Sequence, residues 1–283
     1  MITFPNAKIN LGLQVINKRP DGFHNIATVF YPIGLNDALE IVHSNVSSGG
    51  FNMSGRQISG PPGSNLCLRA LKLLMSKNRN PELGNPDNFR IHLHKVIPMG
   101  AGLGGGSSDG AFTIMALNRL MGLDLTPAQM MEYARELGND CPFFIKNEPV
   151  IAHGRGDQFE PFQIDLSNVF LIVVMPDIQV STALAYAMVT PSVPAKPLPQ
   201  IISQPIETWR DELINDFEEP VFSKFPAIGV IKHRLYQAGA IYASMTGSGA
   251  AVFGIFSTKP EITHLFPGSL IWLKKKEPGM KNY

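Results

Sequence analysis

"PMGAGLGGGSSDGA", residues 98–111, places five glycines between positions 100 and 106, directly before two serines and an apolar run. Glycine is costly to order, and it offers in return a positive φ and a close approach to its backbone. Apolar residues then recur at helical spacing from Phe112 to Leu120, so we expect a helix that Ser107 or Ser108 opens. Unpaired main-chain N–H groups at the start of such a helix, next to the positive end of its dipole, can hold phosphate.

The N-terminal residues predict a hairpin that comes before this loop. Apolar residues from Ile9 to Val15 alternate with polar or small ones, which is typical of a strand with one buried face. Lys8 and Asn10 share the opposite face of that strand. A turn at Pro20-Asp21-Gly22 leads to a second strand over residues 24–31, which places Phe23 and His24 at the tip of the hairpin.

Further strands and helices follow along the chain. A third strand ends near Val42, residues 44–62 form a loop with one short strand, and Ser64 or Asn65 caps a helix that runs to about Met75. The strand at residues 89–93 leads into the glycine loop, and Thr126-Pro127 starts a helix that Gly138 ends. The apolar run 169–175 is a buried strand. The later elements that we expect are helices at 182–188, 208–216 and 225–237, strands at 241–245, 252–256 and 270–273, and an irregular connection at 191–200.

These elements predict an α/β (α+β) protein of two domains. We place the boundary near residues 154–157, which gives an N-terminal domain of residues 1–155 and a C-terminal domain of residues 156–283.

The composition restricts the classes of partner. With 24 Lys and Arg against 23 Asp and Glu, the net charge is +1, so no overall basic field draws the chain to nucleic acid or to acidic membranes. The two cysteines, Cys67 and Cys141, show no metal-binding spacing, and no charged-then-apolar leader follows Met1. We therefore expect a soluble, reduced, cytoplasmic protein.

The residues alone leave several interpretations of the loop open. A Walker A loop is excluded, because no lysine stands between the glycines and Ser107. Gly100, Gly102 and Gly105 satisfy G-x-G-x-x-G, with Asp124 at a distance suited to a ribose, but the Rossmann motif follows the first strand of its unit. A nicotinamide oxidoreductase is thus a distant alternative, and a purely structural loop is another.

Six stretches carry a resemblance to a known family. "PNAKINLGL" (5–13), the glycine loop and "MTGSGAAVF" (245–253) resemble the three signature motifs of the GHMP small-molecule kinases. "RPDGFHNI" (19–26), "SNLCLRAL" (64–71) and "GNDCPFF" (138–144) are similar to the members that phosphorylate the 2-hydroxyl of a cytidine-diphosphate-linked methylerythritol in the non-mevalonate isoprenoid route. The resemblance implies a ribosomal-protein-S5-like N-terminal domain, a ferredoxin-like C-terminal domain and a site between them.

The resemblance also implies roles for individual residues. Asp140 is expected to take the proton of the acceptor hydroxyl, while Lys8 orients that hydroxyl and offsets charge on the transferring phosphoryl group. The residues expected to bind ATP are Asn65, Leu66, Lys95, Pro98, Met99, Gly100, Ala101, Gly102, Leu103, Gly104, Gly105, Gly106, Ser107 and Ser108. Those expected at the substrate are Asn10, Phe23, His24, Asp140, Gly247, Ser248 and Gly249.

The sequence departs from the family's pattern at three of these places. Phe23 stands where the family usually has tyrosine, which keeps a stacking face for cytosine but removes the hydroxyl. Asn139 and Asn6 each replace a small alanine, next to Asp140 and near Lys8 respectively.

ATP is the expected co-substrate, and Mg²⁺ is expected with it. No D-x-D-like acid pair is present, so the metal ligands stay open, with Ser107, Ser108 and the phosphates as candidates. Two other functions remain: a GHMP kinase acting on a mevalonate-like alcohol or homoserine, and a non-enzymatic nucleotide or RNA binder built on an S5-like domain. The sequence does not choose between a monomer and a homodimer.

Overall fold

The computed structural model describes residues 1–43, 49–57, 61–78 and 85–274. The chain forms two compact units, and both are discontinuous in sequence. The first unit comprises Met1–Lys8, Gly34–Met99 and Gly104–Glu148, and the second comprises Ile9–Ile33, Gly100–Leu103 and the chain from Pro149 onward. This division differs from a single cut after residue 155, which stays a prediction, because residues 9–33 and 100–103 group with the second half.

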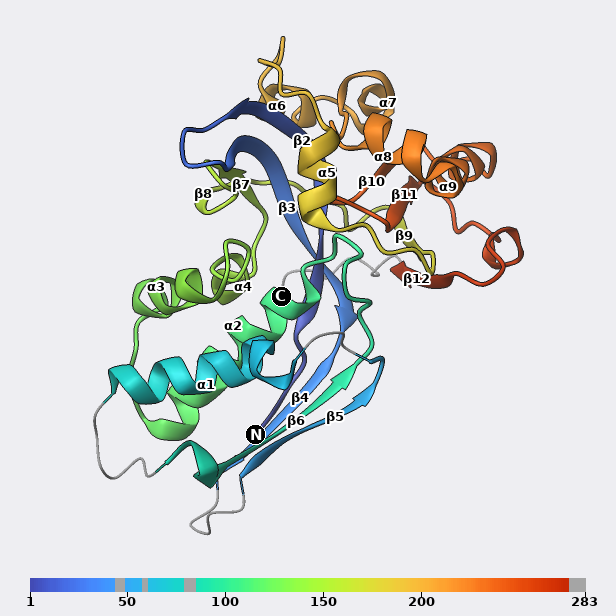
Figure 1. The fold of residues 1–283 in the computed structure, drawn as a ribbon. Coiled ribbons are helices and arrows are strands. Elements are labelled where there is room, and N and C mark those ends of the chain that lie inside the picture. Colours follow the sequence, from blue (N-terminus) through green and yellow to red (C-terminus); the bar gives the residue numbers. More distant parts are fainter. Residues whose placement is uncertain (44–48, 58–60, 79–84, 275–283) are drawn as a thin grey trace, which may run out of the picture. The chain divides into compact units, whose positions relative to one another are not determined.

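The first unit is a sheet covered by helices on one face (Figure 1). The strand order is β1-β4-β6-β5, in which β5 runs parallel to β6 and the other pairs are antiparallel. The strands are β1 (Ile2–Thr3), β4 (Ala38–His43), β5 (Gly50–Gly55) and β6 (Phe89–Lys95). The helices are α1 (Leu66–Lys77), α2 (Gly105–Met121), α3 (Pro127–Leu137) and α4 (Phe143–Lys146). Strict alternation along β6 buries Phe89, Ile91 and Leu93 against α1 and α2, which forms the core of this unit.

Local capping signals start and end these helices. The Asn65 side chain accepts a 2.9 Å hydrogen bond from the Cys67 N–H at the start of α1, Thr126 forms a capping box for α3, and Gly138 ends α3. These three predictions are confirmed. By contrast, α2 begins at Gly105, ahead of the predicted Ser107 or Ser108, because Gly104 takes a left-handed φ of 71° and caps the helix earlier.

The second unit contains two antiparallel sheets (Figure 1), and of the strands β2 and β3 it includes the parts within residues 9–33. One has the order β2-β3-β7-β8, and the other has the order β10-β11-β9-β12. Their strands are β2 (Asn6–Lys18), β3 (His24–Asn36), β7 (Val150–His153), β8 (Gln158–Pro161), β9 (Phe170–Met175), β10 (Tyr242–Met245), β11 (Val252–Phe256) and β12 (Leu270–Lys274). The helices are α5 (Thr182–Met188), α6 (Leu198–Ile202), α7 (Trp209–Glu212), α8 (Glu218–Lys224) and α9 (Pro226–Gln237). Ile172 and Val174 of β9 share one core with Ile228 and Leu235 of α9.

Some elements differ from the sequence prediction. The helix expected over residues 208–216 is a 3-10 turn at Ile206–Thr208 followed by the short α7, and α8 is a further helix that the pattern did not indicate. Within the irregular stretch 191–200, α6 begins at Leu198. By contrast, the short strand expected within residues 44–62 is confirmed as β5, while residues 44–48 and 58–60 lie outside the described residues.

The prediction of one exposed face on β2 is wrong. Lys8, Asn10 and Gln14 are all more than 90 % buried, so both faces of the strand are covered. Hydrogen bonds offset the cost of burying these amides: the Asn10 Nδ2 donates to the Thr28 hydroxyl, and the Gln14 Nε2 donates to the Lys196 carbonyl oxygen.

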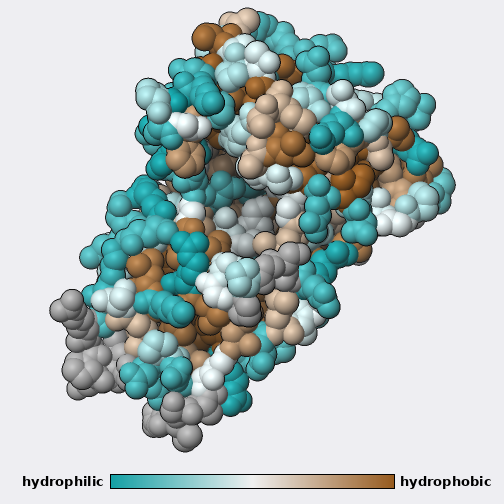
Figure 2. Space-filling view, in the orientation of Figure 1, coloured by the Kyte–Doolittle hydropathy of each residue, from teal (hydrophilic) through white to brown (hydrophobic). Residues whose placement is uncertain are grey.

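Over the described ranges, no helix is long and apolar enough to cross a membrane. The face of the molecule in Figure 2 mixes hydrophilic and hydrophobic residues throughout.

Candidate active site

Lys8 and Asp140 lie side by side in the first unit. The Lys8 Nζ is 3.6 Å from the Asp140 Oδ2, and the two side chains are 5 % and 34 % exposed. Asp140 is presented by a turn after α3, in which the Cys141 N–H donates to the Gly138 carbonyl oxygen at 3.2 Å. Burial lowers the pKa of Lys8, and Asp140 opposes that shift by favouring the ammonium. The pair thus combines a buried cation with an accessible carboxylate.

The N-terminus of α2 adjoins the stem of Lys8. A Cβ at Gly104 would lie 3.2 Å from the Lys8 Cε and 3.0 Å from the ring of Phe144. Only a glycine leaves room there for the lysine to pass so close to the helix end. The first turn of α2 therefore offers its main-chain N–H groups next to the Lys8–Asp140 pair, which is an arrangement suited to an anion.

The first residues of the glycine loop belong to the second unit and contact the segment after β10. A Cβ at Gly102, where φ is 77°, would lie 2.0 Å from the carbonyl oxygen of Thr246. The Ala251 N–H donates to the Ala101 carbonyl oxygen at 3.2 Å, and the Thr246 hydroxyl reaches the Gly102 carbonyl oxygen at 3.3 Å. This close backbone approach explains the glycine at position 102.

Asn10 also contacts Thr246, which lies beside the glycine loop in the second unit. Its main-chain N–H and its Oδ1 both bond to the Thr246 hydroxyl, at 2.9 and 3.2 Å, and its Nδ2 donates to the Thr28 hydroxyl at 2.9 Å. Gly247, Ser248 and Gly249 follow directly, and the Ser248 hydroxyl lies 3.2 Å from that of Thr182. These contacts therefore fix the amide of Asn10 and the third motif in one place.

The hairpin tip carries an aromatic group. Phe23 is 51 % exposed, whereas the His24 ring stacks on Tyr186 of α5, with centroids 4.9 Å apart and planes 22° apart. Tyr186 in turn packs edge-on against Phe217. Burial lowers the pKa of His24, and the nearby Lys18 adds to the shift, so the imidazole is neutral at pH 7.

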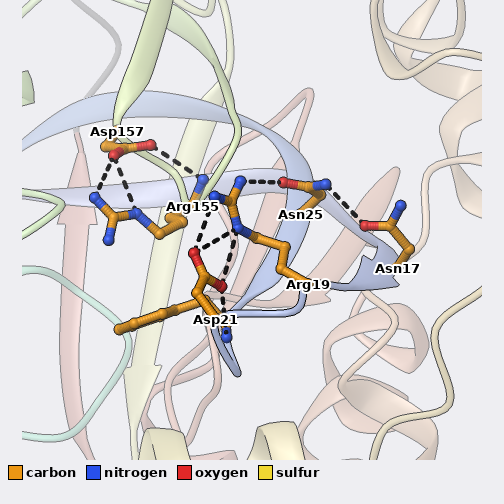
Figure 3. A network of polar contacts seen from close by, with 7 residues as sticks. Asn17, Arg19, Asp21, Asn25, Arg155 and Asp157 are labelled. Atoms are coloured by element: carbon orange, nitrogen blue, oxygen red, sulfur yellow. Dashed lines mark hydrogen bonds and ion pairs between the residues drawn. The ribbon is translucent and has the colours of Figure 1, made fainter.

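A network of polar side chains holds the hairpin (Figure 3). Arg19 binds both oxygens of Asp21 through Nε, at 3.1 and 3.0 Å, and donates to the Asn25 Oδ1 at 3.0 Å. Asn25 donates to Asn17 at 2.8 Å. The loop geometry is therefore set by side chains as well as by the turn residues.

Lys95 has a different environment from the other expected ATP-binding residues. Its ammonium is fully buried between Asp37 and Asp109, with 2.8 Å to the Asp109 Oδ2. A Cβ at Gly105 would lie 2.9 Å from the Lys95 Nζ, so the ion pairs lie directly under the first residue of α2. The lysine side chain thus supports the helix start from below, and it does not reach the surface.

The remaining expected nucleotide residues lie near helix starts of the first unit. Asn65 caps α1, followed by the half-buried Leu66, while Pro98 and Met99 precede the loop and Met99 is 39 % exposed. Among the described residues, no group of three or more His, Cys, Asp or Glu side chains is placed to hold a metal ion.

Sequence reasoning missed two side chains that the structure places at the hairpin. Tyr186 lies in the helix predicted at residues 182–188, and the spacing of residues in that helix gives no signal that distinguishes it. Arg155 lies within the predicted domain boundary at residues 154–157, and its glycine neighbours are the signal that indicates a turn presenting a side chain.

Comparison with known proteins defines the class. Residues 65–148 match the GHMP kinases N terminal domain, and residues 199–265 match the GHMP kinases C terminal domain. With relatives about half identical over nearly the whole chain, this shows that the chain belongs to the GHMP kinases and has their two-domain fold.

The most similar proteins found share one enzyme name within this family. A 4-diphosphocytidyl-2-C-methyl-D-erythritol kinase of Cytophaga hutchinsonii is 50 % identical over 265 residues, which cover 93 % of this chain and 95 % of that protein. One of the same name from Parabacteroides distasonis is 48 % identical, covering 96 % and 98 %. A crystal structure of 4-(cytidine 5'-diphospho)-2C-methyl-D-erythritol kinase is 32 % identical, with a TM-score of 0.78 over 96 % of this chain and 98 % of that one. The mevalonate kinase of Methanococcus jannaschii, at 15 % identity and a TM-score of 0.71, covering 96 % and 97 %, shares the fold alone.

Proposed function

We propose that this protein transfers the γ-phosphoryl group of ATP to the 2-hydroxyl of 4-diphosphocytidyl-2-C-methyl-D-erythritol, giving the 2-phosphate and ADP. The observation that carries the proposal is the Lys8–Asp140 pair, 3.6 Å apart and adjoining the N-terminus of α2. The kinase names of relatives that are 48–50 % identical support this substrate.

The reaction needs a base, an acceptor in line with the γ-phosphorus, and positive charge near the transferring oxygens. Asp140 takes the proton of the 2-hydroxyl while that oxygen forms its bond to phosphorus. The bond from phosphorus to the β–γ bridging oxygen breaks, and ADP leaves with the electron pair. Lys8 orients the hydroxyl and offsets the developing charge.

The nucleotide is assigned to the glycine loop and the start of α2. The amides from Gly104 to Ser107 hold the phosphates without a lysine between the glycines, because the Ser108 N–H donates to the Gly104 carbonyl oxygen within the helix. Asn65, Leu66 and the main chain of Lys95 are assigned to the adenosine. The buried ammonium of Lys95 acts indirectly, by supporting Gly105 from beneath.

The cytidine end of the substrate is assigned to the hairpin. Phe23 offers an exposed ring face for stacking, and the neutral His24 can both donate and accept a hydrogen bond at the edge of the base. Asn10, Gly247, Ser248 and Gly249 are assigned to the rest of the substrate.

Mg²⁺ is assigned to the triphosphate and not to a metal site of the protein. Within the described ranges there is no cluster of acidic or histidine ligands, although the buried Ser108 hydroxyl oxygen lacks a hydrogen-bond partner there. These residues fit a metal ion whose ligands are mainly the phosphate oxygens, with at most one serine hydroxyl from the protein. When bound, the metal would neutralise part of the phosphate charge.

The proposal gives the protein a place in isoprenoid-precursor synthesis in the cytoplasm. Its partners are small molecules, because a net charge of +1 provides no general attraction for nucleic acid or acidic membranes.

One assay tests the function. Purified protein is incubated with ATP, Mg²⁺ and the cytidylylated methylerythritol, and phosphorus NMR follows ADP and the new phosphomonoester. Parallel samples contain mevalonate or homoserine in place of that alcohol. We expect product only with the cytidylylated alcohol. Transfer to another alcohol would identify a different GHMP kinase, and ATP binding without transfer to any alcohol would favour a non-enzymatic binder.

A further inference from the structure

Residues 154–157 form a glycine-flanked turn that presents Arg155. The turn joins β7 to β8, and Gly154 and Gly156 have φ values of 65° and 82° on either side of the arginine. The Ile26 N–H donates to the Gly154 carbonyl oxygen at 2.8 Å, which ties the turn to β3 just after the hairpin tip. The tie places the turn against the β2–β3 hairpin, within the second unit.

Asp157 folds the arginine side chain back over this turn. Its Oδ1 accepts the Arg155 main-chain N–H at 3.0 Å, and its Oδ2 accepts Nε and Nη2 at 3.3 and 3.1 Å (Figure 3). Two guanidinium N–H groups that share one carboxylate oxygen restrict the rotation of the guanidinium group. The Arg155 side chain therefore has a defined direction.

That direction leads to Phe23. The guanidinium carbon lies 5.2 Å from the centroid of the Phe23 ring, within the range of a cation–π contact. The main chain of Phe23 is fixed separately, because its N–H donates to the Asp21 Oδ1 at 3.1 Å and its carbonyl oxygen accepts the Arg19 N–H at 2.8 Å. Arg155 thus restrains the ring, whereas Asp21 and Arg19 restrain the backbone.

We propose that Arg155 is a positioning residue for base recognition: held by Asp157, it packs on one face of Phe23 and orders the ring so that the opposite face receives a pyrimidine. The inference rests on the proposed function, which assigns cytidine to this hairpin. A half-exposed ring that is ordered before the ligand arrives loses less rotational freedom on binding, so affinity for the base rises. Arg155 contributes without touching the ligand.

A double-mutant cycle with two probes tests this. Binding of cytidine and of cytidine 5'-diphosphate is measured by calorimetry, with ADP present to fill the ATP site, for the unmodified chain, Arg155→Met, Phe23→Ala and the double variant. We expect Arg155→Met to weaken both probes about fivefold, and to have no further effect once Phe23 is alanine. Arg155→Lys, which keeps a cation, should recover part of the loss.

The chain offers a matched control. Arg210 lies 4.5 Å over the Tyr236 ring, away from the hairpin residues in sequence, so Arg210→Met removes a similar contact and should leave both affinities unchanged. Asp157→Asn is the second variant, because it removes the carboxylate charge that holds the guanidinium group without removing the arginine, and it should weaken both probes in the same direction as Arg155→Met.

Three results would overturn the inference. A loss with the diphosphate but not with cytidine would mean that Arg155 binds phosphate directly. Additive effects of the two substitutions would mean that Arg155 does not act through Phe23. An equal loss from Arg210→Met would mean a general effect on stability. If the unmodified chain binds neither probe, the proposed substrate itself is wrong, whereas binding without coupling removes only this inference.

Discussion

The Nζ of Lys8, near the start of β2, lies 3.6 Å from the Oδ2 of Asp140, in the turn after α3. The lysine is buried and the carboxylate is one-third exposed, so a ligand can reach the acid while the cation stays behind it. The stem of the same lysine lies against Gly104, the residue that caps the start of α2. The first unit therefore holds an acid, a cation and a helix N-terminus in contact.

Replacing either member of the pair should strongly slow phosphoryl transfer while leaving ATP binding intact. Lys8→Ala and Asp140→Ala are each expected to lower kcat at least about 100-fold, because they remove charge stabilisation and the base respectively. ADP release by a coupled assay measures the rate, and calorimetry measures ATP binding, which should change by less than about threefold. A loss of less than tenfold in kcat for both variants would contradict the assigned roles.

His24→Ala should weaken cytidine diphosphate binding and leave ADP binding unchanged. Because burial and Lys18 lower the pKa of His24, the unmodified imidazole stays neutral through pH 7 and 8. The affinity for cytidine diphosphate should therefore be flat across that range and fall only when the pH drops below the usual histidine pKa of about 6.5. Titrations at several pH values check this, and an affinity that falls between pH 7 and 8 would rule the role out.

Asp109→Asn should change how stability depends on pH. Burial raises the pKa of Asp109 from 3.8 to about 7, with Lys95 opposing and Asp37 adding to the shift. Between these two pH values the folded protein holds a proton that the unfolded chain has released. This contribution to stability is largest below pH 4 and is lost as pH rises to 7.

The Tm of the unmodified chain should thus fall relative to that of Asp109→Asn between pH 5 and pH 8, by about 3 °C or more. Thermal unfolding of both proteins in matched buffers gives the difference. A constant difference in Tm would show that Asp109 does not titrate in this window.

Gly102→Ala should destabilise the protein far more than Gly100→Ala. Both glycines have a positive φ, but a Cβ at Gly102 would lie 2.0 Å from the Thr246 carbonyl oxygen, while at Gly100 nothing lies within 4 Å. We expect a loss of about 3 kcal/mol or more for Gly102→Ala and of about 1 kcal/mol for Gly100→Ala, which carries only the backbone strain. Urea unfolding measures both, and equal losses would mean that the contact with Thr246 is absent.

Local signals predicted the elements that depend on near neighbours. Asn65, Thr126 and Gly138 mark helix ends because each satisfies or terminates main-chain hydrogen bonds within a few residues. The sequence did not predict elements that depend on packing between segments far apart in the chain. It missed the helix α8, and it predicted an exposed face on β2, where distant segments bury Lys8 and Asn10.

The candidate site divides in the same way. The sequence alone is enough to predict a glycine loop at the start of a helix, a hairpin tip with Phe23 and His24, and the motifs of the family. These features depend on backbone freedom, turn residues and periodicity, which act over only a few residues. Only the tertiary structure decides that Lys8 meets Asp140, that Lys95 lies between two buried carboxylates, and that Arg155 covers Phe23. Each of these contacts joins residues that are remote in the chain, and their energies depend on burial and on short distances that arise only once the segments have packed.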